Sequence, residues 1–181
     1  MVRVRPAAPA DAPAMGRLHV RAWQAAYRGQ MPDDYLDGLE PERRAAYWAG
    51  ALGREHPRGA ILVAEEAGQV IGFAAVGPSR DPEGAGELFA INLDPAHWGT
   101  GAGRALLEAA QAELARLGFG ETVLWVLPGN ARARRFYETA GWRADGSERT
   151  AEGHGVSFAE VRYRRRSTSE ETSSATPEGT E

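Results

Sequence analysis

Cysteine is absent from this chain of 181 residues, which excludes disulfide bonds, thiolate catalysis and zinc sites built on cysteine. The chain also lacks an apolar run long enough to cross a membrane, and none follows residues 1–6 as a signal peptide would require. The formal net charge is −4, whereas a nucleic-acid-binding domain usually carries an excess of positive charge. These absences predict a cytoplasmic protein that binds neither membranes nor nucleic acid.

The composition suits one folded domain with a polar end. Hydrophobic residues make up 43% and charged residues 25% of the chain, which provides enough apolar material for a core at this length. Residues 167–181 are instead mostly serine, threonine and glutamate, a composition that does not pack. We therefore expect a domain over residues 1–166 and a disordered tail over residues 167–181.

Strands and helices alternate along this domain. Apolar residues recur at helical spacing in some segments, whereas short apolar runs bounded by glycine or proline predict strands in others. The run 122–127 is apolar on both faces, as expected for a central strand covered by helices on each side. The order of elements indicates an α/β or α+β domain with a mixed sheet. The expected strands are 1–5, 61–64, 70–76, 87–93, 122–127, 142–148 and 156–163; the expected helices are 11–29, 104–118, 130–139 and short pieces within 31–54.

A glycine-rich turn joins the strand 87–93 to the next helix. Residues 94–104 read DPAHWGTGAGR, and glycine at alternate positions lets backbone N–H groups approach a ligand closely. The helix start adds free donors and the positive end of its dipole, a combination typical of a phosphate site. A Walker A loop is excluded, because Arg104 and Ala105 stand where it needs Lys and Ser or Thr. The position after a hairpin argues against a dinucleotide-binding unit.

A second motif begins at Asn130. Residues 130–142 read NARARRFYETAGW and, with residues 98–103, resemble the two signatures of the GNAT superfamily of acyl-CoA-dependent N-acetyltransferases. The first family pattern is Gln or Arg, two residues, Gly, any residue, then Gly or Ala. Gly101 and Gly103 match it, whereas Trp98 departs from its first position and could stack on the cofactor or pack under the turn. In the second signature only Trp142 differs, in place of Phe. The resemblance covers residues 2–163.

The resemblance implies a fold and a co-substrate, acetyl-CoA. The fold is a mixed, mostly antiparallel central sheet of about seven strands flanked by helices, with a splayed strand pair that holds acetyl-CoA. In the family, the glycine turn holds the pyrophosphate, and pantetheine binds the strand end as an added strand would. A bulge there would turn a backbone N–H towards the thioester oxygen. No metal is implied. The implied cofactor-binding residues are Ile91, Asn92, Leu93, Gly99, Thr100, Gly101, Ala102, Gly103, Arg104 and Asn130.

The resemblance also points to catalytic residues. Tyr137 matches a tyrosine that protonates the departing thiolate, and a phenol of pKa about 10 can act as an acid towards a thiol of about 8.5. As an alternative, Tyr137 only anchors the short helix. An amine acceptor must lose a proton before it attacks, and some members carry a glutamate for this purpose where this chain has Trp125. Other members place an acid, acting directly or through water, at the start of the strand that leads to the bulge, which is Glu87 here. The resemblance therefore points to Glu87 as the base, although it could simply solvate the strand end.

The predicted function is direct transfer of an acetyl group from acetyl-CoA to an amine in a ternary complex. The acceptor is a small-molecule or peptide amine, and we expect residues 23–48 to select it. Within that segment, Trp23 and Tyr27 either line a pocket or pack in the core. The sequence leaves a homodimer open. The alternatives are a regulatory module that binds acyl-CoA with little or no catalysis, and a site for nucleotide phosphate.

Overall fold

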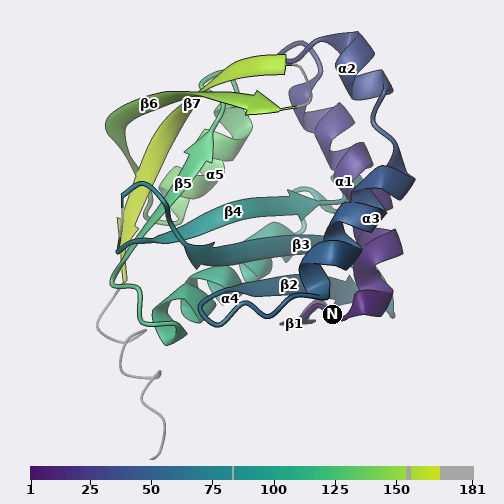
Figure 1. Cartoon of the computed structure of the whole chain (residues 1–181), viewed down its shortest axis with the longest axis horizontal. Helices are drawn as coiled ribbons and strands as arrows, with labels where there is room; N and C mark the ends of the chain where they lie inside the picture. Colours follow the sequence, from purple (N-terminus) through teal and green to yellow (C-terminus); the bar gives the residue numbers. More distant parts are fainter. Residues whose placement is uncertain (83, 154–155, 168–181) are drawn as a thin grey trace, which may run out of the picture.

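The computed structural model describes residues 1–82, 84–153 and 156–167. Seven strands form one sheet in the order β1-β2-β3-β4-β5-β7-β6, with helices on both faces (Figure 1), which confirms the predicted fold class. Apart from Ser167, the predicted tail lies outside the described residues. The strands are β1 (Arg3–Pro6), β2 (Ala60–Glu66), β3 (Gln69–Pro78), β4 (Gly86–Leu93), β5 (Glu121–Val126), β6 (Arg143–Gly153) and β7 (Val156–Arg166); the α-helices are α1 (Ala12–Tyr27), α2 (Asp33–Asp37), α3 (Pro41–Leu52), α4 (Ala102–Arg116) and α5 (Ala131–Thr139).

The sheet is antiparallel except between β4 and β5. These two strands pair in parallel only at Gly86 with Thr122 and at Glu87 with Val123, and beyond that point they diverge (Figure 1). The β3–β4 ladder pairs Val76 with Leu88 and Ala75 with Ala90, which leaves Phe89 as the extra residue of a bulge. The sheet therefore has the expected splayed pair, with a bulge in the middle of β4.

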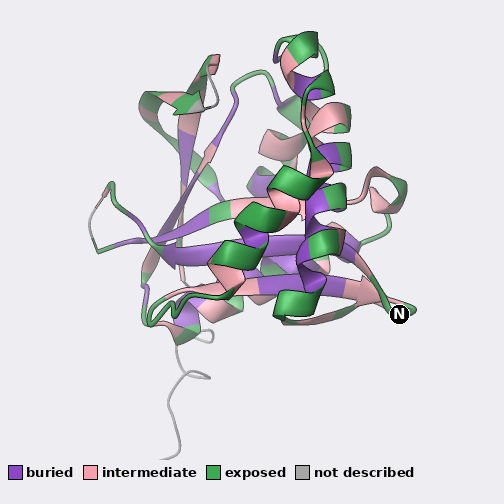
Figure 2. Ribbon diagram, turned by 45° about the vertical axis from the view of Figure 1, so that its right-hand side comes forward, coloured by how far each residue is buried: buried purple, intermediate pink, exposed green. Residues whose placement is uncertain are grey.

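The central strands bury both faces. On β2, Leu62 and Ala64 pack with the α4 side of the core, whereas Val63 packs with α1 and α3. On β3, Ala74 packs on the α4 side and Phe73 on the side of α1 and α3, since successive side chains of a strand point to opposite faces. Figure 2 shows these strands as largely buried, with exposed residues on the outer side of the helices. Two apolar layers therefore hold the sheet in place around the site.

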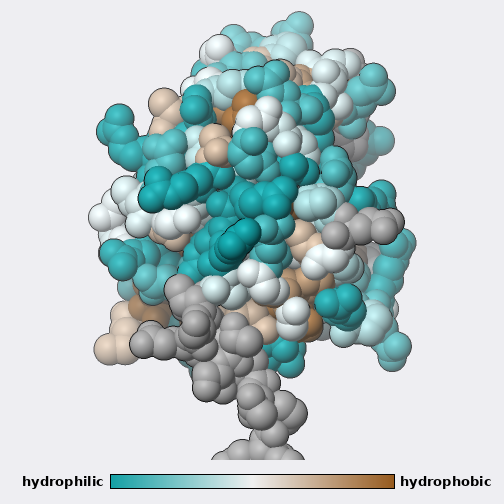
Figure 3. Space-filling view, turned by 90° about the vertical axis from the view of Figure 1, so that its left-hand side faces the viewer, coloured by the Kyte–Doolittle hydropathy of each residue, from teal (hydrophilic) through white to brown (hydrophobic). Residues whose placement is uncertain are grey.

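The last hairpin is longer than predicted. β6 extends to Gly153 and β7 to Arg166, so the basic run 164–166, which lies beyond the predicted strand 156–163, is the last part of a strand. The reason is tertiary: residues 161–166 of β7 pair with the whole of β5, from Val126 to Glu121. Glu121 also forms an ion pair with Arg164. Figure 3 shows that this side of the molecule is mostly hydrophilic.

Helices α1 and α3 approach each other closely at Gly16. A Cβ built on Gly16 would lie 2.5 Å from the carbonyl oxygen of Pro41 and 2.6 Å from the nitrogen of Ala45. Because both neighbours are backbone atoms, neither can move aside as a flexible side chain would. This contact fixes the position of α3, which carries one wall of the site described below.

We expect Gly16→Ala to reduce the free energy of unfolding by about 1–3 kcal/mol, because the added methyl group overpacks the α1–α3 contact. Gly50→Ala is the control: Gly50 lies in α3, and nothing comes within 4 Å of a Cβ there. That change should be neutral or stabilise by up to about 1 kcal/mol. Denaturant unfolding measures both, and equal stability of the two variants would contradict this account of the contact.

Candidate active site

A cavity of about 370 Å³ lies where β4 and β5 diverge. Its walls come from the end of β4, the glycine-rich turn, the end of β5, the first turns of α5 and one face of α1. The structure therefore brings both sequence motifs to one place. The residues singled out from the sequence that line this cavity are Ile91, Asn92, Leu93, Gly99, Gly101, Gly103, Arg104, Asn130 and Tyr137.

The glycine-rich turn enters α4 through left-handed backbone. Gly99 has a φ of 78° and Gly101 a φ of 92°, values that a residue with a Cβ rarely adopts. Gly101 immediately precedes α4 and has no side chain to cap it. The first N–H groups of α4 and the positive end of its dipole therefore lie at the cavity, where they can bind an anion.

Tyr137 is a buried wall of the same cavity. Its ring lies among aromatic neighbours, with centroids 5.4 Å from Phe136 and 6.4 Å from Trp142. Burial raises the pKa of Tyr137 above its usual value, so the phenol is protonated throughout the neutral range. Asn130 caps α5 by accepting a hydrogen bond from the N–H of Ala133 at 3.1 Å, which positions the helix that carries Tyr137.

Three residues predicted from the sequence do not line the cavity. Thr100 donates its hydroxyl to the carbonyl oxygen of His97 at 2.8 Å, and Ala102 is buried at the start of α4. Glu87 is 8% exposed and accepts a hydrogen bond from the Ser79 hydroxyl at 2.9 Å. Burial raises the pKa of Glu87, and the Ser79 bond opposes that rise. Glu87 is thus a buried carboxyl outside the cavity lining.

Glu160 lines the cavity, although the sequence motifs did not indicate it. It lies on β7, where Arg162 pairs with Trp125 of β5, so Glu160 is on the same face of the sheet as Trp125. Its side chain is 12% exposed and forms an ion pair with Arg149 at 2.7 Å. Burial, followed by the charge of Glu160, raises the pKa of Tyr27 to about 12. The strand pattern of residues 156–163 was the only sign of this position in the sequence, but such a pattern does not show which strand lies next to Trp125 in the sheet.

Trp98 packs between the turn and β4. Its indole N–H donates to the carbonyl oxygen of Leu93 at 3.1 Å, and the guanidinium carbon of Arg132 lies 3.1 Å from the centroid of its ring. Both Trp98 and Arg132 line the cavity. Of the two roles that the sequence left open, packing at the turn is what the structure shows, with the ring face covered by Arg132.

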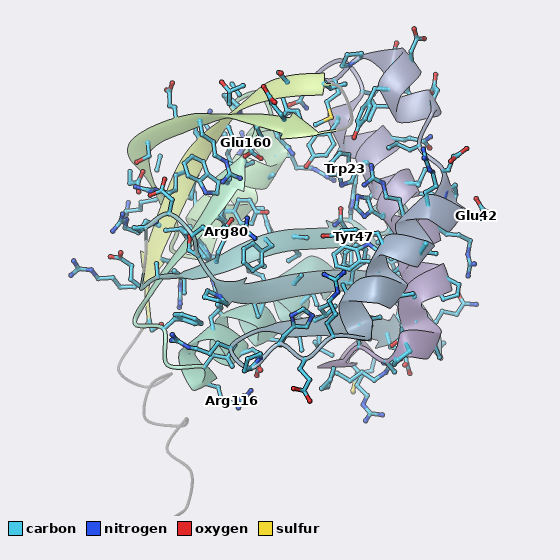
Figure 4. The ribbon with its side chains drawn as sticks, viewed as in Figure 1. Trp23, Glu42, Tyr47, Arg80, Arg116 and Glu160 are labelled. Carbon is cyan, nitrogen blue, oxygen red and sulfur yellow. The ribbon has the colours of Figure 1, made fainter. Side chains whose placement is uncertain are left out.

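A second and larger cavity, of about 920 Å³, adjoins the first. Trp23 lines both, and Tyr27 lines the smaller one, so these side chains form pocket walls. Tyr47 and the bulge residue Phe89 line the larger cavity and are 63% and 53% exposed. Figure 4 shows Trp23 and Tyr47 on the α1–α3 side of the site and Glu160 on the β5–β7 side.

Within residues 1–82, 84–153 and 156–167, no cluster of three His, Asp or Glu side chains is arranged to hold a metal ion. None of the helices described there is long and apolar enough to span a membrane.

Residues 20–142 match the model of the acetyltransferase (GNAT) family. The chain belongs to this family. It is a GNAT N-acetyltransferase, an acyltransferase that uses acetyl-CoA, which confirms the resemblance seen in the two motifs. The match covers the smaller cavity from Ala22 to Tyr137 and ends before Glu160.

The chain is similar to several acetyltransferases. An uncharacterized N-acetyltransferase, YuaI of Bacillus subtilis, is 36% identical over 132 residues, which are 72% of this chain and 74% of YuaI. A mycothiol acetyltransferase of Thermobispora bispora is 38% identical over 92 residues, 47% of this chain but 31% of that protein. The PaiA N-acetyltransferase of Thermoplasma acidophilum, solved with coenzyme A, superposes with a TM-score of 0.77 at 17% identity over 92% of this chain and 99% of that chain.

The cavity suits the donor of a GNAT enzyme. The uncapped start of α4 offers N–H donors to phosphate, and the narrow space between β4 and β5 is bordered by strand backbone on two sides. The structure of yncA from Salmonella typhimurium, which holds acetyl-CoA, has the same fold, with a TM-score of 0.65 at 24% identity over 91% of this chain and 93% of that one.

We expect Gly101→Ala to weaken acetyl-CoA binding by about tenfold or more, because a Cβ disfavours the left-handed backbone by about 1–2 kcal/mol and displaces the turn. Gly118→Ala is the control: Gly118 has a φ of 88° at the other end of α4, so it should lose similar stability without losing affinity. Calorimetry and thermal unfolding separate the two effects. Unchanged affinity in Gly101→Ala would show that the turn does not contribute to acetyl-CoA binding.

Proposed function

We propose that this enzyme transfers an acetyl group directly from acetyl-CoA to an amine while both are bound. The observation that carries the proposal is the meeting of two cavities at Trp23, which lines both. The donor occupies the smaller cavity, with its pyrophosphate at the start of α4 and its thioester arm along β4. The acceptor enters through the larger cavity, whose walls include Tyr47 and Phe89. The acceptor is a small-molecule or peptide amine.

Tyr137 is the proposed acid. When the amine nitrogen forms its bond to the acetyl carbon, the carbon–sulfur bond breaks and the sulfur needs a proton. The Tyr137 phenol lines the donor cavity, and burial keeps it protonated by raising its pKa. The transfer leaves Tyr137 as a phenolate, which takes a proton back from solvent or from the coenzyme A thiol, the stronger acid of the two, before the next turnover.

Glu160 is the proposed acceptor of the proton that the amine gives up. It is the acidic residue that lines the donor cavity among the described parts of the chain, and Arg149 holds its carboxylate in place at 2.7 Å. Glu87, the candidate from the sequence, lies behind the lining but close enough for Glu160 to raise its pKa, although burial is the larger cause. We propose Glu160 for the direct contact and keep Glu87 as the competing candidate.

Thiol release from acetyl-CoA tests the function with a panel of amines: tyramine, spermidine, lysine and a peptide that begins with alanine. The chain has neither cysteine nor lysine, so it contributes no thiol background and no lysine that competes as acceptor. Acceptor-dependent thiol and an acetylated amine of matching mass support the proposal. Tight binding of acetyl-CoA with no transfer to any amine would favour the regulatory module instead.

We expect Tyr137→Phe to lower kcat by about 10²-fold or more and to leave the Kd for acetyl-CoA unchanged, because it removes only the proton donor. Tyr163→Phe is the matched control. Tyr163 is also a buried tyrosine, but its hydroxyl donates to Glu138 at 2.7 Å and it does not line the cavity. That variant should lose stability and keep its kcat. A Tyr137→Phe enzyme with normal kcat would exclude the phenol from the reaction.

We expect Glu160→Gln to lower kcat at pH 7 by about 10²-fold or more, and the loss to shrink as the pH rises towards the amine pKa of about 10, where the acceptor is already neutral. Glu87→Gln should show a much smaller loss at pH 7. The pH dependence of kcat for both variants, measured with the best amine of the panel, decides between them. The reverse ranking would assign the proton acceptor to Glu87.

A further inference from the structure

Arg132, near the start of α5, lies over the ring of Trp98. Its guanidinium carbon lies 3.1 Å from the centroid of the indole ring, and both side chains line the smaller cavity beside Gly99 and Gly101. Arginine stacks on aromatic faces through cation–π and planar contacts. The contact joins a helix and a turn that come from the two different sequence motifs.

Trp98 is a fixed platform for this arginine. Its indole N–H donates to the carbonyl oxygen of Leu93, the last residue of β4, so the plane of the ring is set by the backbone of that strand. A guanidinium that lies flat on the ring has its N–H donors directed outward in its own plane. Stacking therefore restricts the side chain and leaves its hydrogen-bonding edges available to a ligand in the cavity.

Arg132 has no ion-pair partner in the part of the chain that the structure describes. Its side chain also makes no hydrogen bond there, whereas Arg134 on the same helix donates to the Tyr163 hydroxyl at 2.9 Å and to the carbonyl oxygen of Pro128 at 3.0 Å. Burial lowers the pKa of Arg132, although the nearby Tyr27 opposes that change. Arg132 still falls among the exposed residues of α5, so a ligand can reach it, and a cation beside the positive end of α4 favours a bound anion.

We propose that Arg132, held flat on Trp98, binds the pyrophosphate of the donor together with the glycine-rich turn. This inference rests on the proposed placement of acetyl-CoA in the smaller cavity. It also accounts for Trp98, which stands where the loop pattern has Gln or Arg: the loop supplies the aromatic platform, and α5 supplies the cation from another part of the chain. Two parallel N–H donors of a guanidinium match two oxygens of a phosphate.

Calorimetry with coenzyme A and with dephospho-coenzyme A tests the proposal. We expect Arg132→Ala to weaken both ligands by about tenfold or more, and equally, because both carry the pyrophosphate. The slope of log affinity against log salt should fall because one cation–phosphate contact is lost, as in other phosphate complexes. Arg135→Ala is the matched control, since Arg135 is an exposed arginine of the same helix that does not line the cavity. It should change affinity less than twofold.

Changes at Trp98 test the stacking. Trp98→Leu should weaken coenzyme A, and Trp98→Leu combined with Arg132→Ala should bind no worse than the weaker single variant, because both act through one contact. Arg132→Lys should give an intermediate loss, since lysine keeps the charge but loses the planar stack. Thermal unfolding of Arg132→Ala should match the wild type, which separates a binding role from a structural one.

Several outcomes would overturn the proposal. If Arg132→Ala lost affinity for coenzyme A but not for dephospho-coenzyme A, Arg132 would bind the 3′-phosphate instead of the pyrophosphate. An equal loss of coenzyme A affinity in Arg135→Ala would indicate that only the general positive charge of α5 matters. Unchanged affinity in Arg132→Ala would exclude a contact between Arg132 and the pyrophosphate. If the wild-type protein bound neither coenzyme A nor dephospho-coenzyme A, the proposed donor site itself would be wrong. If the wild-type protein bound coenzyme A normally but transferred no acetyl group, the proposed reaction would be wrong, whereas the proposed role of Arg132 in binding would be unaffected.

Discussion

The divergence of β4 and β5 is the constraint on which the site depends. After two parallel pairs, the second half of β4 pairs only with β3 among the described strands, so one row of its backbone groups faces the cavity. Buried N–H and C=O groups require partners, and an extended amide-bearing ligand can supply them as an added strand would. A complete β4–β5 ladder would satisfy the same groups and close the cavity.

The polarity of the cavity follows from what surrounds this opening. The uncapped start of α4 and the guanidinium of Arg132 place positive charge at the turn, whereas the carboxylate of Glu160 lies on the β5–β7 side. An anionic pyrophosphate and a cationic amine are therefore attracted to different parts of the same site. Tyr137, neutral and buried, lines the cavity with them.

The fold and the donor side were readable because their signals are local. Hydrophobic periodicity located most of the strands and helices, and the glycines of the turn are needed by the backbone geometry of residues 99–101 themselves. The ends of the last hairpin were not readable, since β7 continues to Arg166 through pairing with β5 and an ion pair to Glu121. Such long-range pairing leaves no mark in a window of neighbouring residues.

The sequence by itself determined the family, the sheet with its helices and the glycine turn, because each rests on residues adjacent in the chain. Only the tertiary structure decided which carboxylate lines the cavity and which cation stands beside the turn. Glu160 comes close to Trp125 through the β5–β7 register, and Arg132 meets Trp98 because the start of α5 and the glycine-rich turn border the same cavity. Both depend on the packing of distant elements, which residue spacing cannot encode.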